Sequence, residues 1–332
     1  MLRNGSTVLV TGGTGFTGSV LVRKLVSLGC CVRVIARESA NRSSVDDLNV
    51  EWIVGDVFNA AIVERACEGV AYVFHLAAAY RVAGVPDETY HNVHIKSTQL
   101  LAKYSNTGGN LKRFVHVSTV GVHGHIDNPP ANEDSPFQPG DIYQRTKAEA
   151  ETWISEYAIA NNFPLTVVRP AAIFGAGDMR LLKLFKLAKL SVVPIIGYSR
   201  GLYHLIHVDD LVEFMICAAE SDESVDQIYI CGNARSTSIR EIITIVAKHL
   251  HRNPKFVRFP AWPIFWLAYA CEAVCKLIRV EPPIYPRRVA FFTKDRSFDT
   301  SKMTAVSNFQ YAHTNKSGIE ATCNWYIEKN LL

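Results

Sequence analysis

The chain is 332 residues long, and 48% of its residues are hydrophobic while 20% are charged. At about 150 residues per domain, two structural units are the first expectation. A chain of this length buries a core large enough to need neither a metal nor a disulfide framework. The 35 basic and 31 acidic residues leave a net charge of +4 and are scattered along the sequence, which argues against a nucleic-acid partner.

Cysteine and hydropathy patterns indicate a reducing compartment and no membrane-spanning segment. The eight cysteines have no C-x-x-C spacing, as expected for buried thiols. The N-terminus has no apolar stretch of signal-peptide length. The longest charge-free apolar run, 259–271, has 13 residues, whereas a bilayer needs about 20. We therefore predict a cytoplasmic protein.

Six short apolar runs precede residue 171, and they are continuous rather than alternating. They cover 7–12, 31–36, 50–55, 71–76, 113–118 and 165–170. Such runs are typical of parallel strands covered on both faces. Helical patterns lie between them over 19–28, 59–67, 87–105 and 143–161. This alternation predicts an α/β fold with a Rossmann-type doubly wound parallel sheet.

The pattern changes after Pro170. A short strand is expected at 227–230, and helices are expected at about 209–220, 238–250 and 263–278. We predict a smaller C-terminal α+β subdomain. The predicted division is a first unit over 1–175 and a mainly C-terminal second unit over 176–332.

The segment TGGTGFTG, residues 11–18, follows the first strand and opens the first helix. Gly12, Gly15 and Gly18 form the pattern G-x-x-G-x-x-G. A tight turn and a diphosphate that approaches the backbone near a helix N-terminus both require residues without Cβ. The strand–turn–helix context favours dinucleotide binding over a plain glycine-rich turn.

The second and third strands end in residues that would face the adenosine part of a dinucleotide. Where an acidic residue would hold the ribose hydroxyls, the chain has Ala36 followed by Arg37, with Arg42 nearby. Because a guanidinium group matches the geometry of the 2′-phosphate, NADP(H) is the favoured cofactor, and NAD(H) stays possible. The alternative is that Arg37 is solvated and does not contact the cofactor. Asp56 would accept from the adenine amino group, or would cap the helix over 59–67.

Tyr143 and Lys147 lie one helical turn apart. An ammonium beside a phenol lowers the tyrosine pKa, so Tyr143 becomes a usable proton donor or acceptor near neutral pH. Ser118 and Thr119 end the fifth strand and could polarise the substrate oxygen. The alternative is a surface tyrosine and lysine, since Y-x-x-x-K also occurs by chance.

Together these motifs resemble the extended short-chain dehydrogenase/reductase family, the NAD-dependent epimerase/dehydratase superfamily, over nearly the whole chain. The motifs are TGGTGFTG (11–18), GDV (55–57), HLAA (75–78), Asn92, ST (118–119), YQRTK (143–147), RPAAIFG (169–175) and HVDD (207–210). The resemblance implies a catalytic trio of Thr119, Tyr143 and Lys147, with Thr119 rather than Ser118 as the catalytic hydroxyl.

The resemblance also implies the residues that hold the cofactor. They are Gly12, Thr14, Gly15, Phe16, Thr17, Gly18, Arg37, Asp56, Val57, Leu76, Ala77, Ala78, Asn92, Tyr143, Lys147, Pro170 and Ile173. No metal site is predicted, because neither His123 and His125 nor His249 and His251 have carboxylate or cysteine neighbours at metal spacing.

The branch of the family is indicated by two neutral positions. Members that act on nucleotide sugars commonly place Asn and Arg where this chain has Ala172 and Tyr203. A buried diphosphate without partners would be costly, unless Arg180, Lys183 or Arg200 binds it differently. The segments RPAAIFGAGD, 281–303 and 318–330 are similar to the 3β-hydroxysteroid dehydrogenase and dihydroflavonol reductase-like branch.

Segment 259–278 carries Trp262, Phe265 and Trp266. It would line an apolar pocket, lie on a membrane interface as a peripheral contact, or close the core of the small unit. The resemblance further implies a homodimer through 87–105 and 143–161. The apolar face of the second helix, which includes Trp153 and Ile154, could equally face the sheet.

The leading interpretation is an NADP(H)-preferring oxidoreductase that interconverts a secondary alcohol and a ketone on an apolar, sterol-, terpenoid- or flavonoid-like small molecule. One alternative is a nucleotide-sugar epimerase or dehydratase, which returns the same hydride to the sugar. Another is a non-catalytic dinucleotide-binding regulatory protein, against which the complete trio argues.

Overall fold

The computed structural model describes residues 2, 5–80, 85–197, 201–277, 280, 282 and 295–332. A parallel sheet of seven strands in the order β11-β6-β5-β4-β1-β2-β3 forms its centre. The strands are β1 (Thr7–Thr11), β2 (Cys31–Ala36), β3 (Glu51–Val54), β4 (Tyr72–His75), β5 (Arg113–Val117), β6 (Leu165–Pro170) and β11 (Gln227–Cys231). The predicted doubly wound fold is confirmed.

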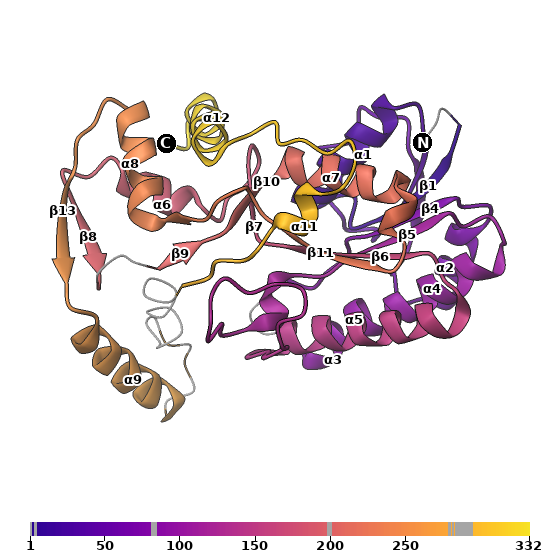
Figure 1. The fold of residues 1–332 in the computed structure, drawn as a ribbon, viewed down its shortest axis with the longest axis horizontal. Helices are drawn as coiled ribbons and strands as arrows, with labels where there is room; N and C mark the ends of the chain where they lie inside the picture. Colours follow the sequence, from indigo (N-terminus) through magenta and orange to yellow (C-terminus); the bar gives the residue numbers. More distant parts are fainter. Residues whose placement is uncertain are drawn as a thin grey trace.

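Helices cover both faces of this sheet, as Figure 1 shows. One face carries α1 (Phe16–Ser27) and α7 (Val208–Glu220), and the other carries α2 (Ala60–Cys67), α4 (Ser97–Thr107) and α5 (Ile142–Asn161). Successive strand residues enter opposite layers: Val8 and Val10 pack in the first cluster and Leu9 in the second. Burial on both faces explains why these strands are continuous apolar runs.

Two segments after residue 175 belong to the central sheet rather than to a separate unit. The strand expected at 227–230 is β11, which pairs in parallel with β6, and α7 packs in the same cluster as α1. The sequence predicted that one segment is a strand and the other a helix, but not that they belong to the central sheet. Pairing of Gln227 with Thr166 depends on tertiary packing.

The helix expected over 87–105 is interrupted. It consists of α3 (Asp87–His91), a π-helical turn η1 (Asn92–Lys96) and α4, which ends at Thr107. A π turn widens the helix locally and is frequent at functional sites. Asn92, one of the predicted cofactor residues, is the first residue of this turn.

The remaining elements pack mainly around a third apolar cluster that includes Phe174, Phe185 and Tyr326. The strands are β7 (Ala172–Phe174), β8 (Val192–Ile196), β9 (Leu202–Tyr203), β10 (Leu205–His207), β12 (Thr237–Ser238) and β13 (Lys255–Phe259). The helices are α6 (Leu182–Leu187), α8 (Ile239–His249), α9 (Ala261–Leu277), α11 (Ser301–Thr304) and α12 (Asn315–Glu328). They pair as β10–β7, β12–β9 and β13–β8.

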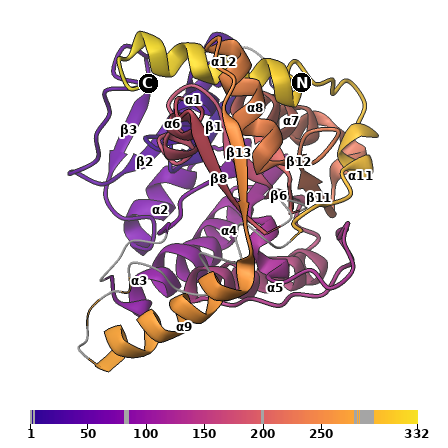
Figure 2. The same ribbon diagram turned by 90° about the vertical axis from the view of Figure 1, so that its left-hand side faces the viewer.

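Helix α9 extends from β13 along the lower edge of the molecule in both views (Figures 1 and 2). Its large side chains are mostly exposed, so the core-closing interpretation of this segment is wrong for most of them; Ala268 and Cys275 are the buried exceptions. No helix within the described ranges is both long and apolar enough to cross a membrane. Most of segment 281–303, used for the family branch, lies outside the described residues.

Candidate active site

The glycine loop between β1 and α1 has the close contacts that a dinucleotide site requires. Gly12 has φ +73°, and a Cβ there would lie 2.9 Å from the Ala77 backbone nitrogen. A Cβ on Gly18 would lie 2.0 Å from the Gly12 carbonyl oxygen. Both positions therefore exclude any side chain.

The first turn of α1 is open to an anion. Its N-cap residue, Gly15, makes no side-chain cap, and the turn contains no acidic residue. Unpaired N–H groups and the positive end of the helix dipole favour a phosphate there. The residues present therefore fit the diphosphate of a dinucleotide.

A buried histidine fastens the loop after β4 to the glycine-loop strand. The Thr11 hydroxyl accepts from the Ala77 N–H at 3.1 Å and donates to His75 Nδ1 at 2.7 Å. The opposite ring nitrogen, Nε2, donates to the hydroxyls of Ser97 and Thr98, which both bond backbone carbonyls. Burial, followed by the nearby lysine charge, lowers the pKa of His75 to about 3, so the ring is a neutral structural link.

A second buried histidine joins this loop to α5. His94, in the π turn, accepts from the Ala79 N–H at 3.0 Å. Its Nδ1 donates at 2.8 Å to the Thr146 hydroxyl, which itself donates to the Ile142 carbonyl. Burial, with smaller effects of neighbouring cations, lowers the pKa of His94 to about 2. The ring therefore positions α5 without gaining a charge.

Tyr143 lies in the first turn of α5, after an N-cap in which Asp141 accepts from the Gln144 N–H. Its ring is buried and contacts the rings of His94 and Tyr80 edge-on, each at 5.4 Å between centroids. Two perpendicular ring contacts restrict the phenol to one orientation. The sequence reasoning named neither His94 nor Tyr80 as a neighbour of Tyr143.

Lys147 is almost fully buried, with 2% of its surface exposed. Its ammonium donates at 2.9 Å to the carbonyl of Val117, the last residue of β5. Burial lowers the pKa of Lys147 to about 8, and Glu151 acts in the opposite direction. The cation is thus held at the carboxyl end of β5, next to Ser118 and Thr119.

The two candidate hydroxyls differ in their surroundings. Thr119 caps the 3₁₀ turn η2 (Val120–His123), and its half-buried oxygen accepts from the Gly121 N–H at 3.0 Å. That bond leaves the hydroxyl proton available for donation. Ser118 is buried, and its oxygen has no partner among the described residues. Thr119 stays the predicted catalytic hydroxyl.

A buried ion pair fixes α5 to β6. Arg169 Nη2 lies 2.6 Å from Glu151 Oε1, and both side chains are at most 3% exposed. Arg169 also donates to the Glu133 carbonyl, bonds His123 and stacks on Phe137. Because Glu151 is one turn after Lys147, this pair positions the part of α5 that carries Lys147.

At the adenosine end, Arg37 is exposed and directly follows β2. No partner for its side chain is recorded in the part of the chain that the structure describes. Arg42 stacks on Trp52 at 4.5 Å. Helix α2 is capped by the Asn59 side chain, so the alternative that Asp56 provides this cap is wrong.

The remaining predicted cofactor residues occupy the same edge of the sheet. Thr14, Phe16 and Thr17 belong to the glycine loop and the start of α1, Val57 follows β3, Leu76 and Ala78 follow β4, Pro170 ends β6 and Ile173 lies in β7. Carboxyl ends of parallel strands meet at one edge, and the order reverses between β4 and β1, where α/β proteins bind their ligands.

Arg180 connects three parts of this edge. Its guanidinium donates to the Ile173 carbonyl at 2.5 Å and to Asp178 at 2.7 Å. It lies 5.7 Å from the Phe16 ring centroid and 5.8 Å from that of Tyr80. The sequence had indicated Arg180 only as a possible ligand of a diphosphate.

The two neutral positions used to choose a family branch have different neighbours. Ala172 is exposed in β7 and presents no hydrogen-bonding side chain. Tyr203 is buried in β9, and its pKa is raised by burial and lowered by the charge of Arg296. A cation from the C-terminal segment thus lies near the position where the family arginine is missing. Arg200, another suggested ligand, lies outside the described residues.

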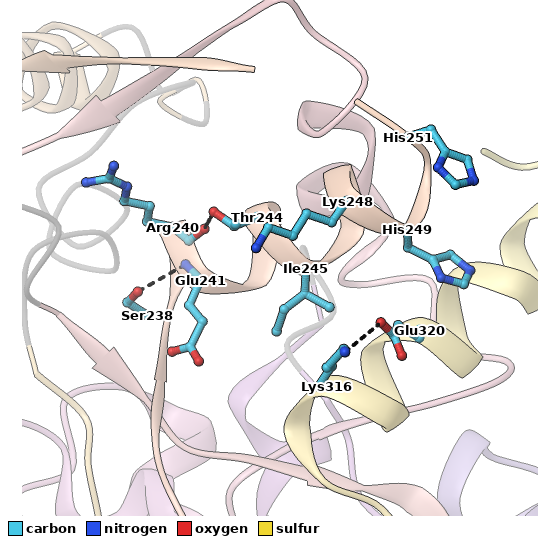
Figure 3. A pocket seen from close by; sticks show the side chains of 10 residues that line it. All are labelled: Ser238, Arg240, Glu241, Thr244, Ile245, Lys248, His249, His251, Lys316 and Glu320. Atoms are coloured by element: carbon cyan, nitrogen blue, oxygen red, sulfur yellow. Dashed lines mark hydrogen bonds and ion pairs between the residues drawn. The ribbon is translucent and has the colours of Figure 1, made fainter. Parts of the chain in front are cut away.

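A groove also lies away from this edge of the sheet. It has a volume of about 890 Å³ and runs between α8 and α12 (Figure 3). Its lining residues are Ser238, Arg240, Glu241, Thr244, Ile245, Lys248, His249, His251, Lys316 and Glu320. None of them belongs to the predicted site, so this groove and the Tyr143 edge are separate features.

Fold and site together define an enzyme of the extended short-chain dehydrogenase/reductase class. The profile of the NAD dependent epimerase/dehydratase family matches residues 8–232, and the chain belongs to that family.

Three similar proteins represent its range. The chain is 28% identical to a 4-hydroxy-2-methyl-3-oxo-4-farnesyl-3,4-dihydroquinoline-1-oxide ketoreductase from Stigmatella aurantiaca, with 94% of each chain covered. It is 26% identical to the decarboxylating sterol-4-alpha-carboxylate 3-dehydrogenase of Mus musculus, over 94% of this chain and 89% of the relative. A solved structure of UDP-glucose 4-epimerase from Thermotoga maritima with UDP-glucose superposes with a TM-score of 0.77 at 21% identity. The superposition covers 98% of this chain and 99% of the epimerase chain.

Proposed function

We propose that this protein is an NADP(H)-preferring oxidoreductase that interconverts a secondary alcohol and a ketone on an apolar small molecule. The observation that carries the proposal is the buried Lys147 ammonium at the end of β5, one turn after the orientated Tyr143. Such a pair supplies a proton at a fixed place near neutral pH.

In the proposed reaction, the phenol of Tyr143 gives its proton to the substrate oxygen during reduction and accepts it during oxidation. Lys147 stabilises the phenolate and binds the nicotinamide ribose. Thr119 donates its free hydroxyl proton to the same substrate oxygen. The nicotinamide, when bound, supplies the hydride chemistry, while Gly12 and the first turn of α1 hold its diphosphate.

Arg37 supports the preference for NADP(H). Its guanidinium is exposed at the end of β2, and the preceding Ala36 offers no carboxylate for the ribose hydroxyls. Titration of the protein with NADPH and NADH tests this choice. We expect tighter NADPH binding, and Arg37→Ala should remove about 1.5–3 kcal/mol of that preference. Equal dissociation constants in the unmutated protein would contradict it.

Ala172 and the names of two relatives support an apolar substrate of sterol, terpenoid or flavonoid type. The nucleotide-sugar alternative is favoured by one specific observation, Arg296 beside Tyr203. A regulatory role without catalysis would not require Thr119, Tyr143 and Lys147 together.

The decisive experiment presents NADPH with ketones and, separately, UDP- and dTDP-sugars. Net oxidation of NADPH with an apolar ketone supports the proposed reductase. Low-micromolar binding of a nucleotide sugar, measured by calorimetry, would overturn it and favour the epimerase. In that outcome Arg296→Ala should weaken sugar binding. Loss of one charged hydrogen bond costs about half of the binding free energy that loss of two would cost, which is on the order of 3–6 kcal/mol.

The division into a cofactor unit over 1–175 and a mainly C-terminal substrate unit over 176–332 is part of the proposal, except that β11 and α7 belong to the sheet of the first unit. So is a homodimer that uses α5. The buried Ile154 faces the sheet and half-buried Trp153 packs against the same cluster, so the exposed face of α5, which includes Ile159, would form the contact. Light scattering at micromolar concentration tests the dimer.

A cytoplasmic location with peripheral membrane contact through 259–278 completes the proposal. Trp262 is 68% exposed and Trp266 is 73% exposed on α9. Exposed tryptophans on one helix suit the interfacial region of a bilayer, and an apolar substrate would be concentrated there. This high exposure of both tryptophans favours the interfacial interpretation over a place in the wall of an enclosed pocket.

A further inference from the structure

Three potential metal ligands converge at the end of β10, the strand that pairs with β7. His207 Nδ1 lies 3.5 Å from Asp209 Oδ2, and His313 Nε2 lies 3.6 Å from the same oxygen. One ligand atom from each residue lies within 4.8 Å of the other two. The imidazole rings are 3.8 Å apart between centroids.

The surrounding structure holds these groups in place. Asp210 accepts from the Ala312 N–H at 2.7 Å, and Asn233 donates to the His313 carbonyl at 2.7 Å. The backbone before and after the His313 side chain is therefore held by hydrogen bonds.

His207 itself is buried, and Phe174 packs edge-on against its ring at 5.3 Å between centroids. A Cβ on Gly318 would lie 3.1 Å from the same ring. The His207 ring is thus fixed by packing, whereas His313 is partly exposed and Asp209 lies at the surface.

We infer that His207, Asp209 and His313 bind a divalent transition-metal ion of the zinc class. Bonds of about 2.0–2.2 Å to imidazole nitrogen and carboxylate oxygen in a tetrahedron place neighbouring ligand atoms about 3.3 Å apart. The two separations from Asp209 need to close by only a few tenths of an ångström, and the two imidazole nitrogens, which lie within 4.8 Å of each other, need to move closer by a side-chain rotation. Asp209 is half exposed, so a water molecule can occupy the fourth position.

The site has one competing interaction. His207 Nδ1 also accepts from the Asp209 N–H, at a long 3.4 Å, and a metal would replace this bond at the start of α7. In exchange, the metal would connect β10 and α7 to the segment that precedes α12. Because α12 packs in the third apolar cluster, metal binding should stabilise the folded chain.

The cluster combines residues about 100 positions apart, which is why no metal-ligand spacing was visible in the sequence. His125 and Asp127 provide a matched control: their side chains also lie 3.6 Å apart, but they are exposed and belong to no three-residue group within the described residues. A pair alone should bind metal weakly.

The test uses full-length protein without a histidine tag, stripped with a chelator and titrated with Zn²⁺ at pH 7.5. We expect one equivalent of zinc to bind. Loss of a direct ligand in His313→Gln should weaken it at least about 100-fold, whereas His125→Gln should bind like the unmutated protein. Zinc at about 100 times its dissociation constant should raise Tm by about 4 °C, but not in His313→Gln.

A second variant, Asp209→Asn, removes a half-exposed ligand without disturbing the core and should also abolish the tight equivalent. Co²⁺ provides the spectroscopic check, with a tetrahedral nitrogen–oxygen spectrum expected. The absence of tight zinc binding would overturn the inference. So would binding that persists in His313→Gln with a cobalt–thiolate band, which would assign the metal to Cys271 and Cys275, whose sulfurs are 4.0 Å apart.

Discussion

The two long helices α5 and α9 invert the usual relation between polarity and burial. Helix α5 has 20 residues and buries Gln144, Thr146, Lys147 and Glu151. Helix α9 has 17 residues and only two charged ones, Glu272 and Lys276, yet its large apolar side chains are mostly exposed. They include Trp262, Trp266, Leu267, Tyr269 and Val274.

The difference follows from what each helix contacts. All four of these polar side chains have a partner. Lys147 bonds Val117, Thr146 bonds His94, Glu151 pairs with Arg169, and Gln144 accepts from the Gly140 N–H at 2.8 Å. Burial of polar groups is tolerated when they are bonded, and it then specifies one arrangement. Helix α9 instead exposes an apolar surface of the kind that marks a contact site.

The buried ion pair on α5 should give the largest effect. Glu151→Ala leaves the Arg169 cation buried without its counter-ion, and loss of one partner of a buried pair costs about 3–5 kcal/mol of unfolding free energy. Urea denaturation measures it. The double variant Glu151→Leu with Arg169→Met should be closer to wild type than the single one. A single variant within about 1 kcal/mol of wild type would show that the pair does not hold α5.

Tyr143→Phe should leave stability and NADPH binding nearly unchanged, because the ring contacts with His94 and Tyr80 need no hydroxyl. Turnover of an identified substrate should fall by about 10²-fold or more. Steady-state kinetics with a parallel cofactor titration separates the two effects. Near-normal turnover with normal binding would mean that another group transfers the proton.

Lys147 should make stability depend on pH. Burial lowers its pKa to about 8, whereas the unfolded chain has the ordinary value of about 10.4. Between these values the unfolded state binds more protons, so unfolding free energy rises with pH, by on the order of 3 kcal/mol in total. Below pH 8 Lys147 is charged in both the folded and the unfolded state, so the cost of burying the cation lowers the unfolding free energy in full.

Lys147→Met tests that sign. It should be more stable than wild type at pH 7, by on the order of 2 kcal/mol, and should lack the rise between pH 8 and 10, while losing activity. Denaturant unfolding at a series of pH values provides the measurement. The same pH dependence in both proteins would assign it to other groups.

Helix α9 should give the smallest stability change. Trp262→Ser with Trp266→Ser removes exposed side chains, so unfolding free energy should change by less than about 0.5 kcal/mol per site. Binding to phospholipid vesicles, measured by sedimentation, should fall. Ile327→Ser on α12, which is 43% exposed, is the control and should bind vesicles like wild type. Equal binding by all three proteins would contradict a membrane contact through α9.

Local patterns were sufficient for much of this protein. The glycine loop, the alternating strands and helices, and the spacing of Tyr143 and Lys147 were all legible in the sequence. Each depends on residues a few positions apart, whose relative placement follows from the geometry of a single turn, strand or helix.

Only the tertiary structure decided which distant residues meet. It placed β11 in the central sheet, His94 and Tyr80 against Tyr143, Arg296 near Tyr203, and His313 beside His207. It also left α9 exposed, although that helix is strongly apolar. These outcomes depend on how separate elements pack, and contacts between residues tens to hundreds of positions apart leave no fixed spacing along the chain.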